Sequence, residues 1–311
     1  MSKRPMCYYH ADCFDGIAAA WVCWKFFEGE VDLQPIQYGD PIAIDKSRMT
    51  YILDFSLKVD VIRAMDSHNL VILDHHKTAA EDFMFNTTKE DLAAFKGIYV
   101  FDMSRSGAMM AWDYFFTAQP APYSIKWIQD RDLWKFEYPT TKMFTAILGA
   151  KPLTVENFEL VHRMSISEVN KTGELLLEKQ QFDVSRISKE ARVITINDYE
   201  LLLVNANHQF ASDLGDYLSN NFNHKYDGVA VYIDIHSGRK FSLRTNRCEV
   251  DLGWLATLFG GGGHRKAASF VLPYSDKRFG KSHVKIRSKG YWWNRVKYFL
   301  MITCNPLAPR A

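Results

Sequence analysis

The stretch from Leu70 to His76, with the sequence LVILDHH, constrains the fold of this 311-residue chain more than any other. Its four apolar residues do not alternate with polar ones, which is typical of a strand buried on both faces in a parallel sheet. Asp74, His75 and His76 then fall at the carboxyl end of the strand, the edge at which open α/β sheets bind ligands. Three metal-capable side chains there indicate a site for cations and phosphate. For this tripeptide alone, a buried structural hydrogen bond between acid and histidine is the alternative.

A second group of polar residues separates the first strand pattern from the first helix pattern. Residues 6–9 are β-prone and residues 17–27 are mostly apolar, so the two predict the opening of a βα unit. The turn between them holds His10, Asp12 and Asp15, which are costly to pack together unless a positive charge neutralises the acids. A cation is the simplest explanation. A solvated loop in which Asp15 caps the helix is the alternative.

The same pattern recurs along the first half of the chain. An apolar run at 51–53 ends in a lone acid, Asp54, and a strand pattern at 98–102 leads into a helix pattern at 108–116. This β-α alternation predicts an α/β fold with a doubly wound, mainly parallel sheet. We assign it to residues 1–150.

Two further acids lie near the end of a helix pattern that begins at Ser124. Asp130 and Asp132 are both candidates for an additional ligand. An ordinary surface turn, in which Arg131 pairs with a neighbouring acid, is the alternative.

The composition changes twice after residue 150. Residues 151–190 are charged, carry apolar residues at helical spacing and contain one glycine, Gly173, which predicts a helical connector. Residues 191–275 combine several strand-like runs with a helix pattern at 210–222. They predict a second, smaller α/β domain.

A run of four glycines, Gly260 to Gly263, follows the last helix pattern of that domain and precedes His264. We interpret the run as a ligand-binding loop and not as core packing. Glycine costs backbone entropy, but it lets the backbone approach a ligand and lets its amides bind an anion. Arg244, at the end of a predicted strand, offers a planar fork for phosphate or carboxylate. A flexible hinge is the alternative for the glycine run.

The end of the chain, residues 276–311, is basic and aromatic. After Asp276 it contains no acid, although the whole chain carries a net charge of only +2. Aromatic residues among lysines and arginines suit nucleic-acid binding. A terminal helix that packs its aromatic side chains onto the body is the interpretation we favour.

The five cysteines include no Cys-x-x-Cys pair, which argues against a disulfide framework and for a reducing compartment. The first residues show no signal-peptide pattern, and the longest apolar run, 17–24, is too short to span a bilayer. We therefore expect a soluble cytoplasmic protein without a membrane partner.

These motifs together resemble the DHH phosphoesterase superfamily, in particular two-domain phosphodiesterases of the RecJ and nanoRNase kind. The first domain carries residues similar to the four family motifs, in the family's order: His10, Asp12 and Asp15; Asp54; Asp74, His75 and His76; and Asp130. The second domain is similar to the companion DHHA1 domain at Arg244 and at the glycine run. One departure is that Cys13 and Phe14 separate the two acids of the first motif, where the family usually has one residue.

The resemblance implies a hydrolase with two manganese ions, which magnesium could replace. It implies one ion held by His10, Asp12 and Asp54, and a second held by Asp15, Asp54, His75 and Asp130. Asp54 would bridge the two ions. These ligands are four acids and two histidines. Such oxygen and imidazole donors favour Mn²⁺, whereas a thiolate-type zinc site would need cysteine ligands.

The resemblance also implies roles for the remaining site residues. Asp74 would orient a ligand histidine, and His76 would contact the scissile phosphate or protonate the leaving group. The rest of the substrate would be held in a cleft between the two domains by Arg244, Gly261, Gly262, Gly263 and His264.

The expected function is therefore a manganese-dependent phosphodiesterase that hydrolyses short oligonucleotides, as an oligonucleotide exonuclease does. A phosphodiesterase for cyclic nucleotides or cyclic dinucleotides is the first alternative. A catalytically inactive module that binds nucleic acid is the second. The expected partners are the nucleotide substrate and a second copy of the chain in a homodimer.

Overall fold

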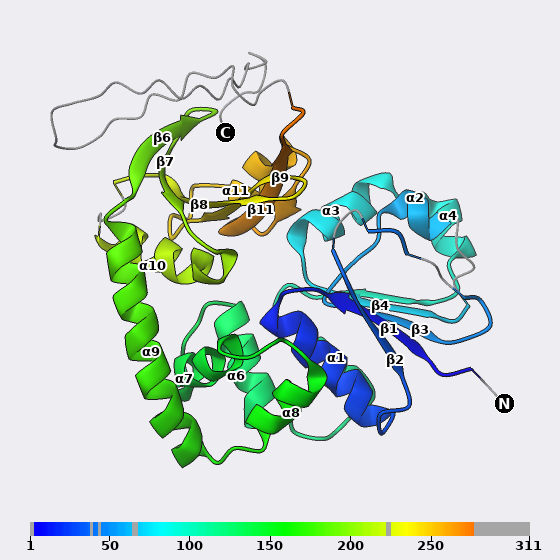
Figure 1. Cartoon of the computed structure of the whole chain (residues 1–311). Coiled ribbons are helices and arrows are strands. Elements are labelled where there is room, and N and C mark those ends of the chain that lie inside the picture. The colour runs from blue at the N-terminus through cyan, green and yellow to red at the C-terminus, as the bar shows by residue number, and fades with distance from the viewer. Residues whose placement is uncertain (1–2, 38–39, 43–44, 64–67, 222–224, 277–311) are drawn as a thin grey trace, which may run out of the picture. The chain divides into compact units, whose positions relative to one another are not determined.

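The computed structural model describes residues 3–37, 40–42, 45–63, 68–221 and 225–276. The chain divides into two units, one up to Gln180 and one from Gln181, and the division falls within helix α9 (Ile166–Ser188). Each unit has its own sheet (Figure 1).

In the described part of the first unit, all strands of a five-stranded sheet run parallel to their neighbours, in the order β2-β1-β3-β4-β5. The strands are β1 (Met6–His10), β2 (Asp32–Ile36), β3 (Thr50–Leu53), β4 (Leu70–Asp74) and β5 (Ile98–Phe101). All five residues of β4 are buried, as its unbroken apolar run predicted. The doubly wound parallel sheet of the first domain is thus confirmed.

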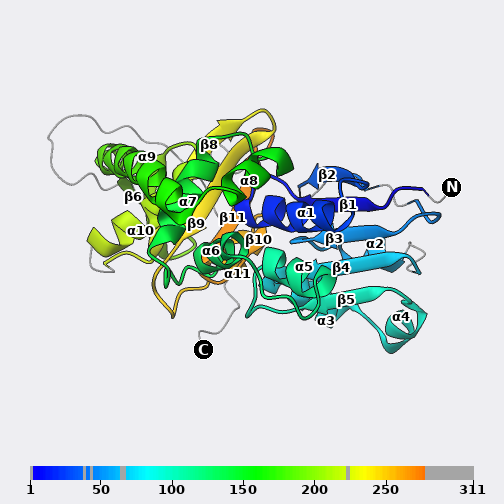
Figure 2. The same ribbon diagram turned by 90° about the horizontal axis from the view of Figure 1, so that it is seen from below.

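Helices cover both faces of this sheet. They are α1 (Phe14–Phe26), α2 (Val59–Arg63), α3 (Lys77–Asn86), α4 (Lys89–Ala94), α5 (Gly107–Phe115), α6 (Tyr123–Asp132), α7 (Thr140–Gly149) and α8 (Val155–His162). Figure 1 shows α2, α3 and α4 on one side of the sheet and α1 on the other, and Figure 2 shows α5 next to α1.

Neighbouring residues of each central strand enter two different cores, because successive side chains of a strand point to opposite faces. On the α1 and α5 face, the core takes Cys7, Tyr51, Leu53, Val71 and Leu73 from the strands. On the face of α2, α3 and α4, it takes Tyr8, Ile52, Leu70 and Ile72. The sheet is therefore a buried middle layer, and its polar side chains are left for the strand ends.

The second unit contains a six-stranded sheet within its described residues, in the order β10-β11-β9-β8-β7-β6. Only β7 and β8 are a parallel pair there; the other pairs are antiparallel. Its elements are β6 (Arg192–Ile196), β7 (Tyr199–Asn205), the short 3-10 helix η1 (His208–Phe210), α10 (Ala211–Asn221), β8 (Gly228–Ile235), β9 (Gly238–Arg244), α11 (Leu252–Thr257), β10 (Gly262–Gly263) and β11 (Ala267–Pro273).

One face of this second sheet packs on α10, through Leu202 and Val229, and the other packs on α11, through Leu243 and Phe270. This arrangement is the smaller α/β domain that the sequence predicted. Helices α8 and α9 occupy the range of the predicted connector, 151–190. The exact domain boundaries remain predictions.

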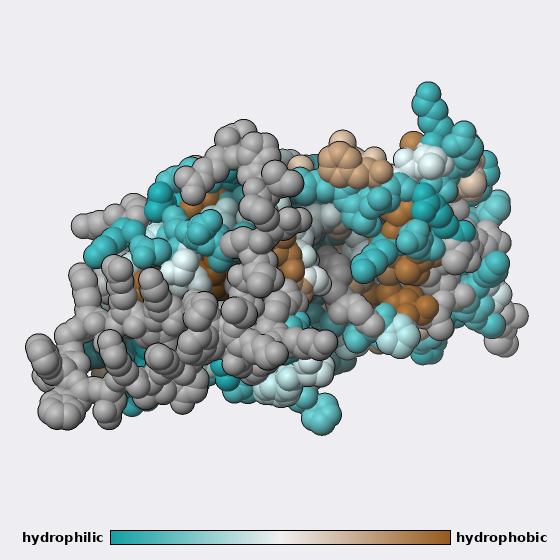
Figure 3. All heavy atoms as spheres, turned by 90° about the horizontal axis from the view of Figure 1, so that it is seen from above, coloured by the Kyte–Doolittle hydropathy of each residue, from teal (hydrophilic) through white to brown (hydrophobic). Residues whose placement is uncertain are grey.

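The surface that the described residues form in Figure 3 is largely hydrophilic, with hydrophobic residues between. Within the described ranges, none of the helices combines the length and the apolar character that crossing a lipid bilayer requires. The predicted basic tail, 276–311, lies outside the described residues except for Asp276.

Candidate functional site

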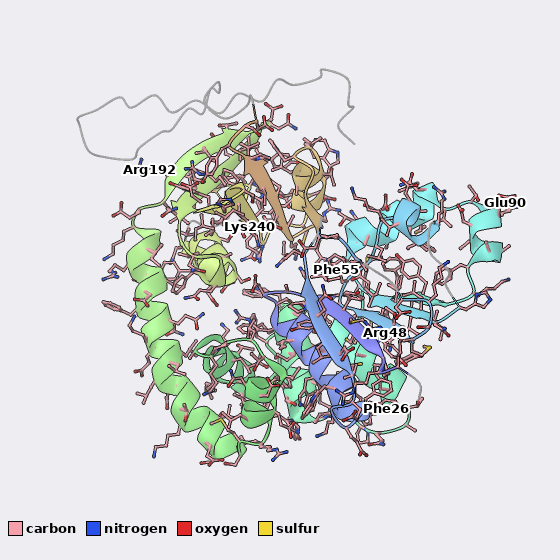
Figure 4. The ribbon with its side chains drawn as sticks, turned by 45° about the vertical axis from the view of Figure 1, so that its right-hand side comes forward. Phe26, Arg48, Phe55, Glu90, Arg192 and Lys240 are labelled. Carbon is pink, nitrogen blue, oxygen red and sulfur yellow. The ribbon has the colours of Figure 1, made fainter. Side chains whose placement is uncertain are left out.

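The candidate site lies at the carboxyl edge of the first sheet. Strand β1 has β2 on one side and β3 on the other, so the strand order reverses between β1 and β3. Crevices at such a reversal are where open α/β sheets bind ligands. His10 ends β1 and Asp54 directly follows β3. In Figure 4, Phe55 marks this end of the sheet and Phe26, at the end of α1, marks the opposite end.

Asp54 occupies the centre of the site. Its carboxylate is only 1% exposed, and His10 Nδ1 lies 3.5 Å from its Oδ2 atom. No hydrogen-bond partner for Oδ2 is found among the described residues. Asp54 also has a φ of +54°, a left-handed backbone conformation that residues other than glycine adopt at a cost. A buried carboxylate oxygen without a hydrogen bond is costly unless a cation meets it.

Asp15 reaches the same place from the first turn of α1. The backbone N–H groups of Gly107 and Ala108, at the start of α5, donate to its two carboxylate oxygens. The positive end of the α5 dipole thus stabilises the charge of Asp15. A Cβ at Gly107 would lie 2.5 Å from Asp54 Cβ, so only glycine lets α5 begin this close to Asp54.

His75 joins these acids to a third. Its Nε2 atom lies 3.0 Å from Asp54 Oδ1, 3.5 Å from Asp15 Oδ2 and 3.6 Å from Asp132 Oδ2. Asp132 is the last residue of α6, and Asp15, Asp54 and His75 are all nearly inaccessible to solvent. One imidazole nitrogen therefore faces three carboxylates from different parts of the chain.

His76 is held by Asp74. The Asp74 carboxylate is fully buried, and its Oδ1 atom lies 2.7 Å from His76 Nδ1. The same oxygen accepts the backbone N–H groups of His75 and His76 at 2.8 and 3.2 Å. Asp74 thereby orients the His76 ring through Nδ1, and Nε2 is the nitrogen on the far side of the ring.

The side chains form two trios whose potential ligand atoms lie within 4.8 Å of one another. The first trio is His10, Asp54 and His76, and the second trio is Asp15, His75 and Asp132. The contact of 3.0 Å between Asp54 and His75 connects them. Carboxylate oxygens with imidazole nitrogens, and one carboxylate oxygen left without a hydrogen bond, fit a pair of divalent cations.

The titration behaviour of the second trio reflects its crowding. Burial raises the pKa of the Asp15 carboxyl, and the charges of Asp54 and Asp132 raise it further. Burial also acts to raise the pKa of Asp54, but the neighbouring imidazoles of His10 and His75 hold that pKa well below its usual range. Burial lowers the pKa of His75, but the charges of Asp132 and Asp54 outweigh burial and raise it well above its usual value.

Two predicted metal ligands lie elsewhere. Asp130 is buried, but its carboxylate accepts the N–H groups of Glu137 and Tyr138 and the hydroxyl of Thr141, so it is engaged by the loop after α6. Asp12 is exposed, and Gln37 lies 3.5 Å from its carboxylate. Neither residue belongs to the two trios.

Asp132 takes the place that was expected of Asp130. Both acids were candidates in the sequence, and the two-residue spacing on one helix was the available signal. Residues two apart on a helix point about 200° away from each other, so only one of them can face the site. Gly107 was not singled out as a site residue; its position directly before an apolar helix was the available signal.

Arg244, a predicted substrate-binding residue of the second unit, packs against helix α10. Arg244 ends β9, where its Nε donates to Ser212 Oγ at 3.2 Å. Its aliphatic part packs so closely on α10 that a Cβ at Gly215 would lie 2.4 Å from Arg244 Cβ.

The glycine run corrects an expectation, because packing does explain two of its members. A Cβ at Gly261 would lie 2.1 Å from the carbonyl oxygen of Ser269, and Gly263 combines a φ of +135° with the same crowding against Ala267. Gly262 and Gly263 form β10, and His264 exchanges backbone hydrogen bonds with Ala267. Gly261 and Gly263 thus pack tightly against β11, and a ligand is not needed to explain these two glycines.

Comparison with known proteins supports the fold. No family model matches the chain. An uncharacterized protein of Acanthamoeba polyphaga mimivirus is 28% identical in an alignment of length 287 that covers 85% of this chain and 66% of that protein. The present chain therefore spans less than two thirds of that relative's length.

Solved structures of low sequence identity align with most of this chain. The DHH domain of a member of the s1p family of ribosomal proteins has a TM-score of 0.55 at 11% identity, over 86% of this chain and 82% of that chain. The pGpG-specific phosphodiesterase PggH from Vibrio cholerae has a TM-score of 0.48 at 13% identity, over 87% and 94%. RecJ with Mn²⁺ from Thermus thermophilus has a TM-score of 0.47 at 11% identity, over 88% and 50%.

The match above a TM-score of 0.5 is to a DHH domain, and it covers most of both chains. The polar strand ends that suggested the resemblance also meet at one edge of the sheet. The first unit and the second unit together therefore share the fold of that DHH domain.

Proposed function

We propose that this chain is a phosphodiesterase that depends on two divalent metal ions and hydrolyses short oligonucleotides. The observation that carries the proposal is the pair of trios at the carboxyl edge of the parallel sheet, connected by Asp54. The DHH fold is consistent with it.

The first trio and the second trio would each hold one ion, with Asp54 between them. Manganese is our first choice because the donors mix carboxylate oxygen with imidazole nitrogen, and magnesium is a possible substitute. Two bound divalent ions activate a water molecule and stabilise the leaving oxygen of a phosphodiester. In this assignment Asp132 replaces Asp130, and Asp12 is a ligand only if its exposed carboxylate turns inward.

His76 is the group that we assign to the phosphate. Asp74 contacts Nδ1 of the His76 ring, so we assign Nε2 to the phosphate, and His10 and Asp54 lie in the same trio as this ring. The charge of Asp74 raises the pKa of His76 against the opposing effect of burial. A protonated His76 could donate a hydrogen bond to the scissile phosphate or a proton to the leaving oxygen. Asp74 is then a positioning residue.

The substrate body remains assigned to the second domain. We propose that Arg244 and His264, with the backbone of Gly261, Gly262 and Gly263, bind the part of the nucleotide that does not react. Because packing against β11 explains Gly261 and Gly263, the test uses substitutions of Arg244 and His264.

The deciding experiment is a substrate panel. Purified protein with Mn²⁺ is incubated with labelled dinucleotides, longer oligonucleotides and cyclic nucleotides, and the products are separated by chromatography. We expect dinucleotides to be hydrolysed fastest, and full chelation with EDTA to stop the reaction. Faster hydrolysis of cyclic substrates would instead indicate a phosphodiesterase for cyclic nucleotides or cyclic dinucleotides. Binding of oligonucleotides without hydrolysis would indicate a catalytically inactive module that binds nucleic acid.

Asp54→Asn tests the metal assignment directly. Loss of a residue that bridges both trios should lower turnover by more than the roughly 10–100-fold typical of residues that only support a metal ligand. Asp102→Asn is the matched control, since Asp102 also directly follows a strand, β5, but its carboxylate is engaged by Ser104 and Arg105. Equal activity in the two variants would refute the assignment.

A further inference from the structure

The loop between α6 and α7 begins directly after Asp132 of the second trio and carries two unusual aromatic residues. Trp134 and Phe136 have φ values of +56° and +52°. Bulky residues rarely adopt this left-handed conformation, and each such residue costs about 1–3 kcal/mol. The surrounding structure must therefore hold both rings in place.

Asp130 supplies much of that restraint. Its carboxylate accepts the N–H groups of Glu137 at 2.8 Å and Tyr138 at 3.2 Å, together with the hydroxyl of Thr141. Its backbone carbonyl accepts the N–H of Lys135 at 2.9 Å. A charge-assisted set of hydrogen bonds from a buried acid thus fixes the strained loop on both sides of Phe136.

The two rings form one unit, which we call the aromatic platform (Trp134 and Phe136). Their centroids lie 4.7 Å apart in an edge-to-face arrangement. Both residues remain partly exposed, although the burial of a hydrophobic ring would be more favourable. A purely structural pair would be expected to turn into the core.

Cations flank the platform. The Lys142 ammonium lies 4.6 Å from the centre of the Phe136 ring, and the Arg131 guanidinium lies 5.8 Å from the Trp134 ring. Arg131 also lies 5.5 Å from the ring of Phe14, one of the two residues that lengthen the first motif. Partly exposed aromatic rings with neighbouring cations are the combination that binds single-stranded nucleotides by stacking and charge.

We propose that the aromatic platform stacks a nucleobase of the substrate, next to the phosphodiester at the second trio. This inference rests on the proposed function and specifies its substrate class as phosphodiesters that carry a nucleobase. Arg131 and Lys142 add positive charge for the adjoining phosphates. Since every base has a flat π-face, the platform tolerates different sequences and selects against substrates that lack a base.

The test compares a dinucleotide with an abasic analogue in which both bases are absent and the phosphodiester is retained. In Trp134→Ala, KM for the dinucleotide should rise about 5–150-fold, because stacking contributes about 1–3 kcal/mol per base, whereas KM for the abasic analogue should stay unchanged. Trp134→Phe should restore most of the affinity. A KM increase of the same size for both substrates would overturn the proposal.

Tyr123→Ala is the matched control. Tyr123 is an exposed aromatic residue at the other end of α6, with Lys126 5.3 Å from its ring. Removing it should leave both KM values unchanged. A dinucleotide-specific increase in this variant as large as that in Trp134→Ala would show that the effect does not belong to the platform.

A binding measurement separates failure of this proposal from failure of the proposed function. Calorimetric titration with adenosine monophosphate and with ribose 5-phosphate requires no turnover. Wild-type protein should bind the nucleotide more tightly, and Trp134→Ala should lose that difference. If no phosphodiester is hydrolysed but the difference is found, the function fails and the platform stands. If the two ligands bind alike in the wild type, the platform is refuted.

Discussion

Asp130 and Asp132 lie two residues apart near the end of α6, and the fold gives them different surroundings. The carboxylate of Asp132 lies 3.6 Å from His75 in the second trio, whereas that of Asp130 is enclosed by the loop after the helix. An acid with three hydrogen-bond donors around it stabilises structure, and an acid facing a histidine and other acids is available to a cation. Chemically identical side chains thus serve different purposes.

The two acids should therefore respond differently to substitution. Asp130→Asn should lower the free energy of unfolding by about 1.5–3 kcal/mol, because hydrogen bonds to a buried charge are lost, while Mn²⁺ affinity changes little. Asp132→Asn should weaken Mn²⁺ binding at least tenfold and leave stability of the metal-free protein nearly unchanged. Denaturant unfolding and calorimetric titration with Mn²⁺ measure the two effects. The reverse pattern would return the ligand role to Asp130.

Among the elements, helix α5 contacts two acids of the site, Asp15 and Asp54. Its first N–H groups hold the Asp15 carboxylate, and its first residue, Gly107, leaves room for Asp54. Ser106 caps the helix by accepting the N–H of Met109 at 3.3 Å. The helix thus brings together acids that the sequence places on two separate strand–helix connections.

Gly107→Ala tests this close approach. Alanine is normally favoured over glycine in a helix by about 1 kcal/mol, but here its Cβ would lie 2.8 Å from the backbone Cα of Asp54. Overpacking against backbone should dominate and lower stability by about 1–3 kcal/mol, with loss of Mn²⁺ affinity as Asp54 is displaced.

Gly149→Ala is the control for Gly107→Ala, because its Cβ would meet only the ring of Phe14, at 3.4 Å. It should be neutral or stabilising, and metal affinity should be retained. Thermal unfolding and titration with Mn²⁺ in both variants provide the measurement. A stable Gly107→Ala variant with normal metal binding would mean that α5 can withdraw from Asp54 at little cost.

For the whole molecule, we expect the stabilisation by bound metal to depend on pH. The folded-state pKa of His75 is raised by Asp132 and Asp54 despite burial, so in the metal-free protein its protonated form contributes stability below the unfolded value of about 6.5. That contribution is lost as pH rises through the raised pKa. Asp15, whose pKa is also raised by burial, has the same sign. Bound cations would replace these protons.

The increase in melting temperature caused by Mn²⁺ should therefore be larger at pH 8 than at pH 6, because the imidazole must lose its proton to bind a metal. At a free Mn²⁺ concentration of 100 times Kd, the stabilisation should be about 2.7 kcal/mol. His162→Gln is the control, since burial lowers the pKa of that distant histidine and its loss should not alter the metal-dependent increase. Equal increases at the two pH values would argue that protonated groups are not displaced.

Much of the first domain could be predicted from local sequence patterns. An unbroken apolar run such as 70–73 is a strand wherever it is buried, and the polar residues that follow it fall at the strand's carboxyl end. Parallel strands align these ends, so strand direction alone predicts that His10, Asp54 and His75 meet. Strand β2 and helix α7 were missed, since β2 contains a proline and polar residues and α7 starts without a strong capping signal.

By itself, then, the sequence determined the parallel sheet, its polar carboxyl edge and most of the residues at that edge, because apolar patterning and strand direction are local properties. Only the tertiary structure decided that Asp132 faces the trios while Asp130 fastens a loop, and that β11 accounts for the crowded glycines. Those outcomes depend on which side of a helix or turn meets a distant backbone. That is set by packing between segments far apart in the chain.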